Sequence, residues 1–140
     1  MEASMAVLAL VLNLYHEARG EGPEGMRVIA DTVYTRVHDS RWPNTYTETI
    51  LQDNQFAWVE EQDIHEPTDL ITLQQRVLHS KSTTPKDLLA YKQATKIAKE
   101  VLSEGYKPKY NFTHFYSSSR PVWANKKRKT RIGHHSFIRM

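Results

Sequence analysis

The hydrophobic residues of this chain are concentrated near its start, where residues 5–12 read MAVLALVL without a polar interruption. A helix that is apolar around its whole circumference is one that neighbouring elements cover on every side. The pattern therefore predicts a buried helix from Ala3 to Ala18 or Arg19. Gly20 follows at the position where a left-handed residue commonly ends a helix, and we expect it to adopt that conformation.

Three later segments carry apolar residues at the spacing of one helix face. They predict helices over residues 23–38, 67–79 and 85–102. The first of them begins with a proline, which is favoured at the first helical position. The last has the clearest limits, with Thr84 as its cap, an acidic residue three positions later, and Gly105 beyond its end.

Two other segments lack helical spacing. Residues 47–58 combine a short helical piece with an extended, aromatic end, and from Tyr106 onward aromatic residues alternate with small polar ones. This second texture predicts short strands or irregular loops. No repeat and no second domain is visible, and 140 residues are enough to bury a sizeable core. We expect a single domain over residues 1–140, mainly α-helical with a small irregular β region.

The amino-acid composition limits the kinds of catalytic site, metal site and partner that the chain can have. The chain has no cysteine, which excludes a disulfide framework, a cysteine-ligated zinc site and a cysteine hydrolase. The net charge of +3 suits an anionic polymer such as nucleic acid or bacterial cell wall, but does not identify one. The run over residues 5–12 is shorter than the roughly 20 apolar residues that span a bilayer. Glu2 stands where a signal peptide carries positive charge, so we expect neither a signal peptide nor membrane insertion.

Ionisable residues gather at the end of the hydrophobic helix, in the segment NLYHEARGEG. A zinc-protease HExxH motif needs a second histidine four residues after His16, but Gly20 stands there, so we expect no metal. Glu17 falls in the last turn, where the negative end of the helix dipole and apolar surroundings both favour its protonated form. A protonated carboxyl in an apolar pocket is the general acid of lysozyme. An ion pair with Arg19 is the structural alternative.

Planar side chains stand beside hydrogen-bonding residues at three places further along the chain. Such pairs suit a saccharide groove, because sugars have apolar ring faces and hydroxyl rims, although aromatic residues also commonly fill a core. The candidates for substrate contact are Gln55, Phe56, Trp58, His114, Tyr116 and Trp123.

These segments together resemble the SleB-type cell wall hydrolase family, the spore-cortex-lytic enzymes and their bacterial and phage relatives. The segment YHEARGEGPEGMRVIADTVYTRV, then QFAW, THFY, a downstream Trp and IGHHSFIR follow the order of that family's motifs across nearly the whole chain. The chain departs from the usual pattern at Thr35, where Asn is common, and at Ala57, where QFSW has Ser. It also departs at His134 and Ile138, where Asn and Tyr are usual.

The resemblance implies a lysozyme-like fold and an enzyme that cleaves peptidoglycan between N-acetylmuramic acid and N-acetylglucosamine. It further implies a lytic transglycosylase with a single catalytic glutamate, which by its match to the EARGE motif is Glu17. The expected partner is bacterial peptidoglycan, and we expect a monomer without a cofactor. Without a signal peptide, the expected location is the cytoplasm until release to the cell wall, as for a phage endolysin, or a virion.

A second carboxylate decides between hydrolysis and transglycosylation. A retaining hydrolase needs one about 5 to 5.5 Å from the acid, and an inverting hydrolase about 6.5 to 9.5 Å from it. Glu21 is the nearby acid in sequence, but it lies beyond the helix end, so the sequence does not give its direction. If it points away, Glu17 acts alone and the 6-hydroxyl of the sugar closes a 1,6-anhydro ring. We predict this route, with a muramidase that uses Glu17 and Glu21 as the alternative.

Two other classes of function stay open. The basic run Lys126–Arg131 (KKRKTR) and the interleaved aromatic residues suit a nucleic-acid-binding domain. That function has no use for Glu17, so we expect no nucleic-acid partner. A metallohydrolase would draw on His16, His114 and one of His134 or His135.

Overall fold

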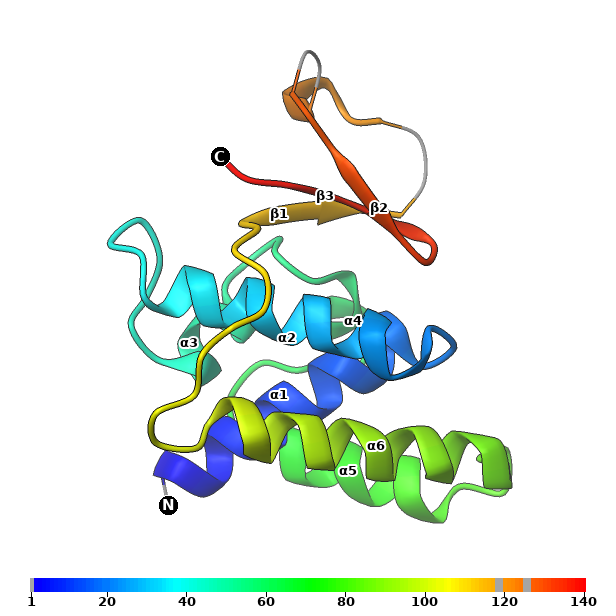
Figure 1. Ribbon diagram of the computed structural model, residues 1–140. Helices are drawn as coiled ribbons and strands as arrows, with labels where there is room; N and C mark the ends of the chain where they lie inside the picture. The colour runs from blue at the N-terminus through cyan, green and yellow to red at the C-terminus, as the bar shows by residue number, and fades with distance from the viewer. Residues whose placement is uncertain (1, 118–119, 125–126) are drawn as a thin grey trace.

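The computed structural model describes residues 2–117, 120–124 and 127–140, and within them a small sheet covers one side of a helical body (Figure 1). The predicted class, mainly α-helical with a small β region, is confirmed. None of the helices in the described part of the chain combines the length and the hydrophobicity needed to cross a membrane. The helices are α1 Glu2–Ala18, α2 Gly22–Val37, α3 Tyr46–Leu51, α4 Ala57–Glu61, α5 Asp69–His79 and α6 Pro85–Val101. The strands are β1 His114–Tyr116, β2 Thr130–Ile132 and β3 His135–Ile138, with the 3-10 helix η1 Val122–Ala124 between β1 and β2.

Helix α1 is the central helix of the body, as its apolar sequence predicts. Every residue from Ala9 to Tyr15 is buried, and α2, α3, α5 and α6 all pack against it. Asn13 interrupts this apolar stretch, and its Oδ1 accepts a hydrogen bond of 2.8 Å from the indole Nε1 of Trp58. Neighbours on all sides fix the position of α1, and therefore of the polar residues at its C-terminal end.

The turn between α1 and α2 differs from the prediction in one respect. Gly20 does not have a positive φ, whereas Gly22, the first residue of α2, has a φ of 78°. The main-chain NH of Glu21 donates to the carbonyl oxygen of Ala18 at 3.0 Å and closes a tight turn. The left-handed residue therefore lies where the chain enters the second helix rather than directly after the first.

The start of α6 follows its sequence signals. The hydroxyl of Thr84 accepts from the main-chain NH of Asp87, and the Asp87 carboxylate accepts from the NH of Thr84, each at 3.0 Å. This reciprocal pair is a capping box, which satisfies two amide donors that a helix start leaves free. Gly105, with a φ of 80°, lies shortly after the last turn. Helix α6 packs along both α1 and α2.

The prediction for residues 47–58 is half right. Helix α3 begins at Tyr46, with the Thr45 side chain accepting from the main-chain NH of Glu48. The aromatic end, however, is not extended as a whole, because only Phe56 has strand-like angles and α4 begins at Ala57. The buried environment around α1 favours a short amphipathic helix there, which local sequence spacing did not reveal. Helix α5 likewise starts at 69 rather than 67.

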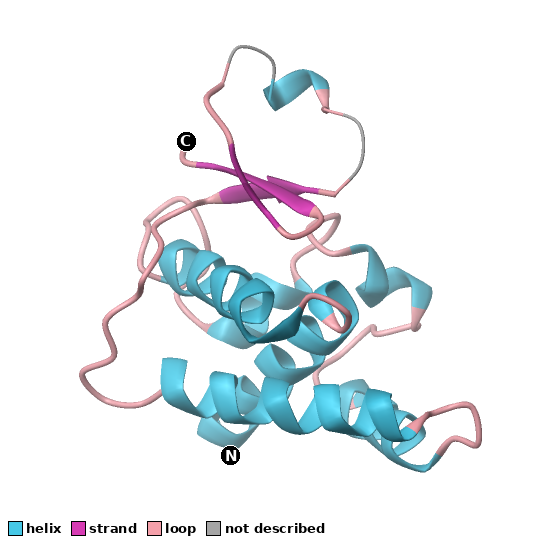
Figure 2. Cartoon of the chain, turned by 45° about the vertical axis from the view of Figure 1, so that its right-hand side comes forward, coloured by secondary structure: helices cyan, strands magenta, loops and turns pink. Residues whose placement is uncertain are grey.

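The C-terminal part forms an antiparallel sheet in the order β1-β3-β2. The central strand, β3, has all four residues buried, and its Phe137 pairs with Phe115 of β1 and Thr130 of β2. The β2–β3 turn contains Gly133, with a φ of 60°. Figure 2 shows the strands lying across the helical body on the side of α2.

Candidate active site

Glu17 lies half-buried in the last turn of α1. Burial, and secondarily the negative charge of Glu61, raise the pKa of its carboxyl from the usual 4.5 to about 7. The alternative ion pair with Arg19 does not form, because the Arg19 guanidinium donates to the hydroxyl of Tyr15 at 2.6 Å and lies 3.8 Å from Asp87. A large fraction of Glu17 therefore carries a proton at neutral pH, and this proton can be donated.

Aromatic packing surrounds the helix turn that carries Glu17. The ring of His16 stacks on the indole of Trp58, with centroids 5.1 Å apart and planes at 17°. Burial, and then the positive charge of Arg19, lower the pKa of His16 to about 4, so its imidazole is neutral at physiological pH. The stacked pair covers one side of this helix turn and contributes no positive charge to it.

Phe56 and Trp58, two of the predicted substrate contacts, lie in the core. Their side chains are only 3% and 5% exposed. Trp58 is covered by His16, and the ring of Phe56 packs at 6.2 Å from that of Phe115. Little of either ring remains for contact with a sugar, so both residues support the site from within.

The carboxylate of Glu21 is held by the β2–β3 turn, 113 residues later in the chain. Its Oε1 accepts from the main-chain NH of His134 at 2.8 Å and lies 3.1 Å from Nδ1 of His135, while Oε2 lies 2.8 Å from Nδ1 of His134. Burial alone would raise the pKa of Glu21, but the main-chain and side-chain hydrogen bonds from His134, together with electrostatic attraction from the two imidazoles, outweigh it and lower the pKa. Glu21 is therefore ionised, and both its oxygens are engaged.

Gly133 allows the hairpin to approach this carboxylate. A Cβ at this position would lie 3.1 Å from the carboxylate carbon and from both oxygens of Glu21. Burial lowers the pKa of His135 more than the charge of Glu21 raises it. The contact thus uses a neutral imidazole with its proton on Nδ1, whose position the hydrogen bond fixes. Glu21 points toward the hairpin, a direction that the sequence did not give.

The histidines of the metallohydrolase hypothesis lie in three different places. His16 stacks in the core, His114 lines a surface cavity, and His134 and His135 bond to Glu21. Within residues 2–117, 120–124 and 127–140, no group of three His, Asp or Glu side chains is arranged to hold a metal ion. The described residues give this hypothesis no support.

A cavity of about 290 Å³ brings three predicted contacts together, and a fourth lies beside it. The ring of His114 lies 5.3 Å from that of Trp123, and Tyr116 packs edge-on against Trp123 at 6.0 Å. Trp123 is 44% exposed, so its ring is available to a ligand. The cavity is lined by Arg36, Asn54, Gln55, His114, Phe115, Trp123 and Met140.

Arg36 is a residue of this cavity that the sequence reasoning missed. It is 6% exposed, and its Nε donates to the carbonyl oxygen of Thr113 at 2.7 Å while Nη1 donates to Oε1 of Gln55 at 3.3 Å. Burial lowers the pKa of its guanidinium to about 10. A signal was present in the sequence, since Arg36 follows Val33 by three residues and Ile29 by seven, on the apolar face of α2.

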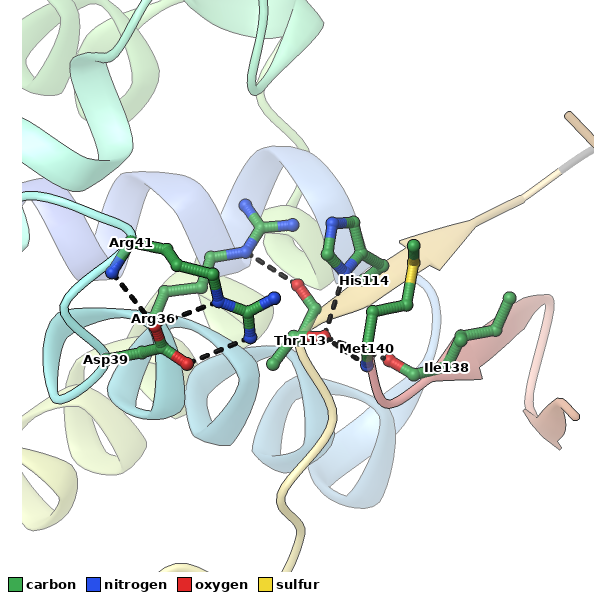
Figure 3. A network of polar contacts seen from close by, with 7 residues as sticks. All are labelled: Arg36, Asp39, Arg41, Thr113, His114, Ile138 and Met140. Atoms are coloured by element: carbon green, nitrogen blue, oxygen red, sulfur yellow. Dashed lines mark hydrogen bonds and ion pairs between the residues drawn. The ribbon is translucent and has the colours of Figure 1, made fainter. Parts of the chain in front are cut away.

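A second arginine lies near the same cavity but has a partner. Arg41 makes a two-atom ion pair with Asp39, at 2.9 and 3.0 Å, which Figure 3 shows beside Arg36. The guanidinium groups of Arg36 and Arg41 both lie over the ring of Trp42, at 5.4 and 4.7 Å. Asp39 neutralises Arg41, whereas Arg36 has no carboxylate within reach among the described residues.

The basic run lies partly outside the described residues, because Lys126 is not among them. The residues from 127 to 131 are exposed, and Arg131 donates to the carbonyl oxygen of Gly133 at 3.3 Å. This exposure fits a solvated loop as well as a surface for an anionic polymer, so it does not favour nucleic acid.

Comparison with known proteins finds one matching family model and two similar solved structures. A family model described as Cell Wall Hydrolase matches residues 20–138, a range that begins just after Glu17. The catalytic domain of the germination-specific lytic transglycosylase SleB from Bacillus anthracis is similar over 96% of this chain and 94% of that chain, with 19% identity and a TM-score of 0.67. The catalytic domain of the Bacillus cereus SleB protein is similar over 97% of this chain and 91% of that chain, with 19% identity and a TM-score of 0.65. A comparison with curated proteins gave no significant match. The structural matches confirm the expected lysozyme-like fold.

Proposed function

This chain belongs to the cell wall hydrolase family and is a peptidoglycan-degrading enzyme, and we propose that it acts as a lytic transglycosylase. The bond cleaved is the one between N-acetylmuramic acid and N-acetylglucosamine, with Glu17 as the only acid and base. One observation carries the proposal: the pKa of Glu17 is raised to about 7, so that it is partly protonated at neutral pH, while Glu21 is ionised and bound by two histidines.

In the first step Glu17 gives its proton to the glycosidic oxygen as the bond from that oxygen to C1 of muramic acid breaks. The pKa of about 7 suits this role, because general acids work best when their pKa lies near the operating pH. Loss of the proton leaves a carboxylate beside the positive charge that develops at C1, which that carboxylate stabilises.

In the second step the same carboxylate takes the proton of the 6-hydroxyl of the muramic acid. The 6-oxygen then bonds to C1 and closes a 1,6-anhydro ring. Glu17 ends the cycle protonated, as it began, and no water is consumed. A single group can serve both steps because its protonated and ionised forms are nearly equal in free energy at a pH near its pKa.

The environment of Glu21 argues against a two-carboxylate hydrolase. A nucleophile or a base needs a free oxygen directed at the sugar, and both oxygens of Glu21 already accept from the hairpin. The lowered pKa also makes this carboxylate a weaker base. We therefore assign Glu21 a positioning role in the turn that follows Glu17.

The substrate contacts that we propose are the exposed or half-buried residues around the cavity. Trp123 and Tyr116 offer ring surface to sugars, and His114 offers a hydrogen-bonding group. Gln55, whose Oε1 accepts from Nη1 of Arg36, lines the cavity and orients that guanidinium. Phe56 and Trp58 are withdrawn from this set because of their burial.

The experiment is mass spectrometry of the products from purified peptidoglycan. We expect muropeptides that end in 1,6-anhydro-muramic acid, lighter by one water, about 18 Da, than the products of a hydrolase. Glu17→Gln should retain the fold and lose at least about 100-fold in activity, because the amide has no proton to transfer. Glu104→Gln, an exposed position in the turn that follows α6, is the matched control and should be fully active.

A digest that contains only reducing ends would favour the muramidase with Glu17 and Glu21. A well-folded Glu17→Gln protein with most of its activity would remove Glu17 from the catalytic role. Salt-sensitive retention of DNA without any cleavage of cell wall would favour the nucleic-acid-binding domain.

A further inference from the structure

The guanidinium of Arg36 is buried, charged and without a counter-ion in the described part of the chain. Arginine has five N–H donors, and only two of those of Arg36 are used, one on Thr113 and one on Gln55. The whole segment between β1 and β2, residues 117–129, contains no Asp or Glu, so its undescribed positions add no carboxylate side chain. Burial of an unpaired charge is costly, and proteins rarely retain one without a use for it.

The unused donors of Arg36 are on the side of the cavity. Its Nε is turned to the carbonyl oxygen of Thr113, and the rest of the guanidinium extends past this atom on the side of His114 (Figure 3). Arg36 and His114 both line the cavity. The end of the guanidinium, with Nη1 and Nη2, is therefore the part that a ligand can reach.

The charges around this cavity are unbalanced. Burial, and then the positive charges of Arg36 and Arg41, lower the pKa of His114, which leaves it neutral. The carboxylate of Asp39 is used by Arg41. The other lining side chains, those of Asn54, Gln55, Phe115, Trp123 and Met140, carry no charge, so Arg36 is the charged side chain of the cavity.

We propose that this cavity binds a carboxylate group of the peptidoglycan substrate, with Nη1 and Nη2 of Arg36 as the donors. This inference rests on the proposed function and specifies which chemical group the site selects. A carboxylate matches the planar fork of a guanidinium with two parallel hydrogen bonds. It also supplies the missing counter-ion, which a neutral sugar hydroxyl does not.

Glu17 does not line the cavity itself, but the short helix α4 connects the two places. Helix α4 ends at Glu61, whose charge acts on Glu17, and Gln55 of the cavity stands two residues before the helix begins. The five residues of this helix span about 7.5 Å. A carboxylate in the cavity can thus belong to the same glycan strand as the bond at Glu17.

Peptidoglycan offers this chemistry from two sources. One is the lactyl carboxylate of a muramic acid from which the peptide has been removed. The other is a free carboxylate of a peptide stem. Both present the same planar anion to Arg36, and substrates with one or the other distinguish them.

The decisive variant is Gln55→Glu. It places a carboxylate where Oε1 of Gln55 already accepts from Nη1 of Arg36, so the guanidinium gains an internal counter-ion at constant side-chain size. We expect KM for the acidic substrate to rise about tenfold with little change in kcat, because a charge-assisted contact made before the chemical step is lost. Gln93→Glu on α6, the same substitution at a half-buried position elsewhere, should change neither constant.

Four substrates identify the source. They are intact peptidoglycan, the same material with its stem carboxylates amidated, glycan strands stripped of peptide, and these strands with their lactyl carboxylates amidated. If the stem is the source, amidation of the stem raises the wild-type KM about tenfold and removes the difference between wild type and Gln55→Glu. If the lactyl group is the source, amidation of the stripped strands has that effect.

Equal KM values on the acidic and amidated forms of both materials would overturn the proposal. So would an effect of Gln55→Glu that persists on the amidated forms, because Arg36 would then contact neutral atoms of the sugar. Arg36→Ala is not a suitable test, since loss of the bond to Thr113 can unfold the protein.

Direct binding separates this site from the proposed function. The Nε–H signal of Arg36, assigned by its disappearance in Arg36→Lys, is followed by NMR during titration with N-acetylmuramic acid or N-acetylglucosamine. Only the acid should shift it. A shift in a protein that cleaves none of the four substrates would refute the proposed function and keep the carboxylate site. No shift with the acid, in a protein that does cleave, would refute the site alone.

Discussion

Replacement of Gly133 by alanine tests the contact between the β2–β3 turn and Glu21. Two effects act together at this position. The φ of 60° is unfavourable for any residue with a side chain, and the new Cβ would lie 3.1 Å from the carboxylate carbon and both oxygens of Glu21. The carboxylate or the turn must therefore move by a few tenths of an ångström.

The two effects can be given magnitudes. A left-handed conformation costs a residue other than glycine about 1 to 2 kcal/mol. Displacement of the carboxylate weakens hydrogen bonds from His134 and His135, and a hydrogen bond to a charged group contributes about 1.5 to 3 kcal/mol. Since His134 is largely exposed to solvent, we expect about 1 to 2 kcal/mol from this second effect. The free energy of unfolding should fall by about 2 to 4 kcal/mol in total.

Alanine substitutions at Gly22 and Gly20 separate the backbone effect from the contact with Glu21. Gly22 has a φ of 78° with nothing within 4 Å of a Cβ, so Gly22→Ala should show only the backbone effect, about 1 to 2 kcal/mol. Gly20 has neither a positive φ nor a close neighbour. Gly20→Ala should therefore be neutral or stabilise by up to about 1 kcal/mol, because alanine restricts the unfolded chain.

The assay is urea unfolding of the three variants and the wild type, followed by circular dichroism at one pH. Equal losses of stability in Gly133→Ala and Gly22→Ala would show that the hairpin does not press on Glu21 as described. A loss in Gly20→Ala as large as that in Gly22→Ala would refute the assignment of the left-handed residue in the turn.

Three further predictions concern the site. The pKa of Glu17 is raised from 4.5 to about 7 in the folded protein, so the native state binds more protons than the unfolded state between these pH values. The stability of the wild type therefore falls as the pH rises through this range. Glu17→Gln should remove this dependence, so that its unfolding free energy exceeds that of the wild type by more at pH 8 than at pH 4. The same pKa predicts that kcat/KM falls as the pH rises above about 7, measured on soluble glycan strands, and a rate that keeps rising to pH 9 would exclude Glu17 as the acid. Trp58→Phe should lower the unfolding free energy by about 1 to 3 kcal/mol, because Oδ1 of Asn13 loses its partner in the core, while Trp123→Ala should raise KM and leave the unfolding free energy unchanged within about 0.5 kcal/mol, since that ring is 44% exposed.

The features that sequence predicted well depend on neighbours in the chain. The buried helix follows from an unbroken apolar run, and the capping box of α6 follows from Thr84 and Asp87. In both cases the sequence signal is local, within a few helical turns, even though distant helices supply the packing around α1. The raised pKa of Glu17 was predictable for the same reason, because its position in the last turn of an apolar helix already implies burial.

The features that sequence could not give depend on distant residues. The direction of Glu21 is decided by a hairpin 113 positions away, and the partner of Arg36 is a carbonyl oxygen 77 positions away. From sequence alone, Trp58 could lie either in the core or on a binding surface, as aromatic residues often do. In the structure its indole NH donates to Asn13 inside the core. The error at Gly20 is smaller, since the tight turn through Glu21 moves the left-handed residue by two positions.

The contact between Glu21 and the hairpin also bears on the order in which the molecule assembles. Contacts among α1, α2 and α3 join segments that lie close in sequence, whereas the hairpin must close a loop of more than 100 residues to reach the turn after α1. Closing a loop of that length is slow relative to local helix pairing. We expect the helical body to form first and the hairpin to dock afterwards. The turn between α1 and α2, which follows Glu17 and contains Glu21, would then acquire its final geometry in the last step of folding. A nascent chain would be inactive until β3 has been synthesised.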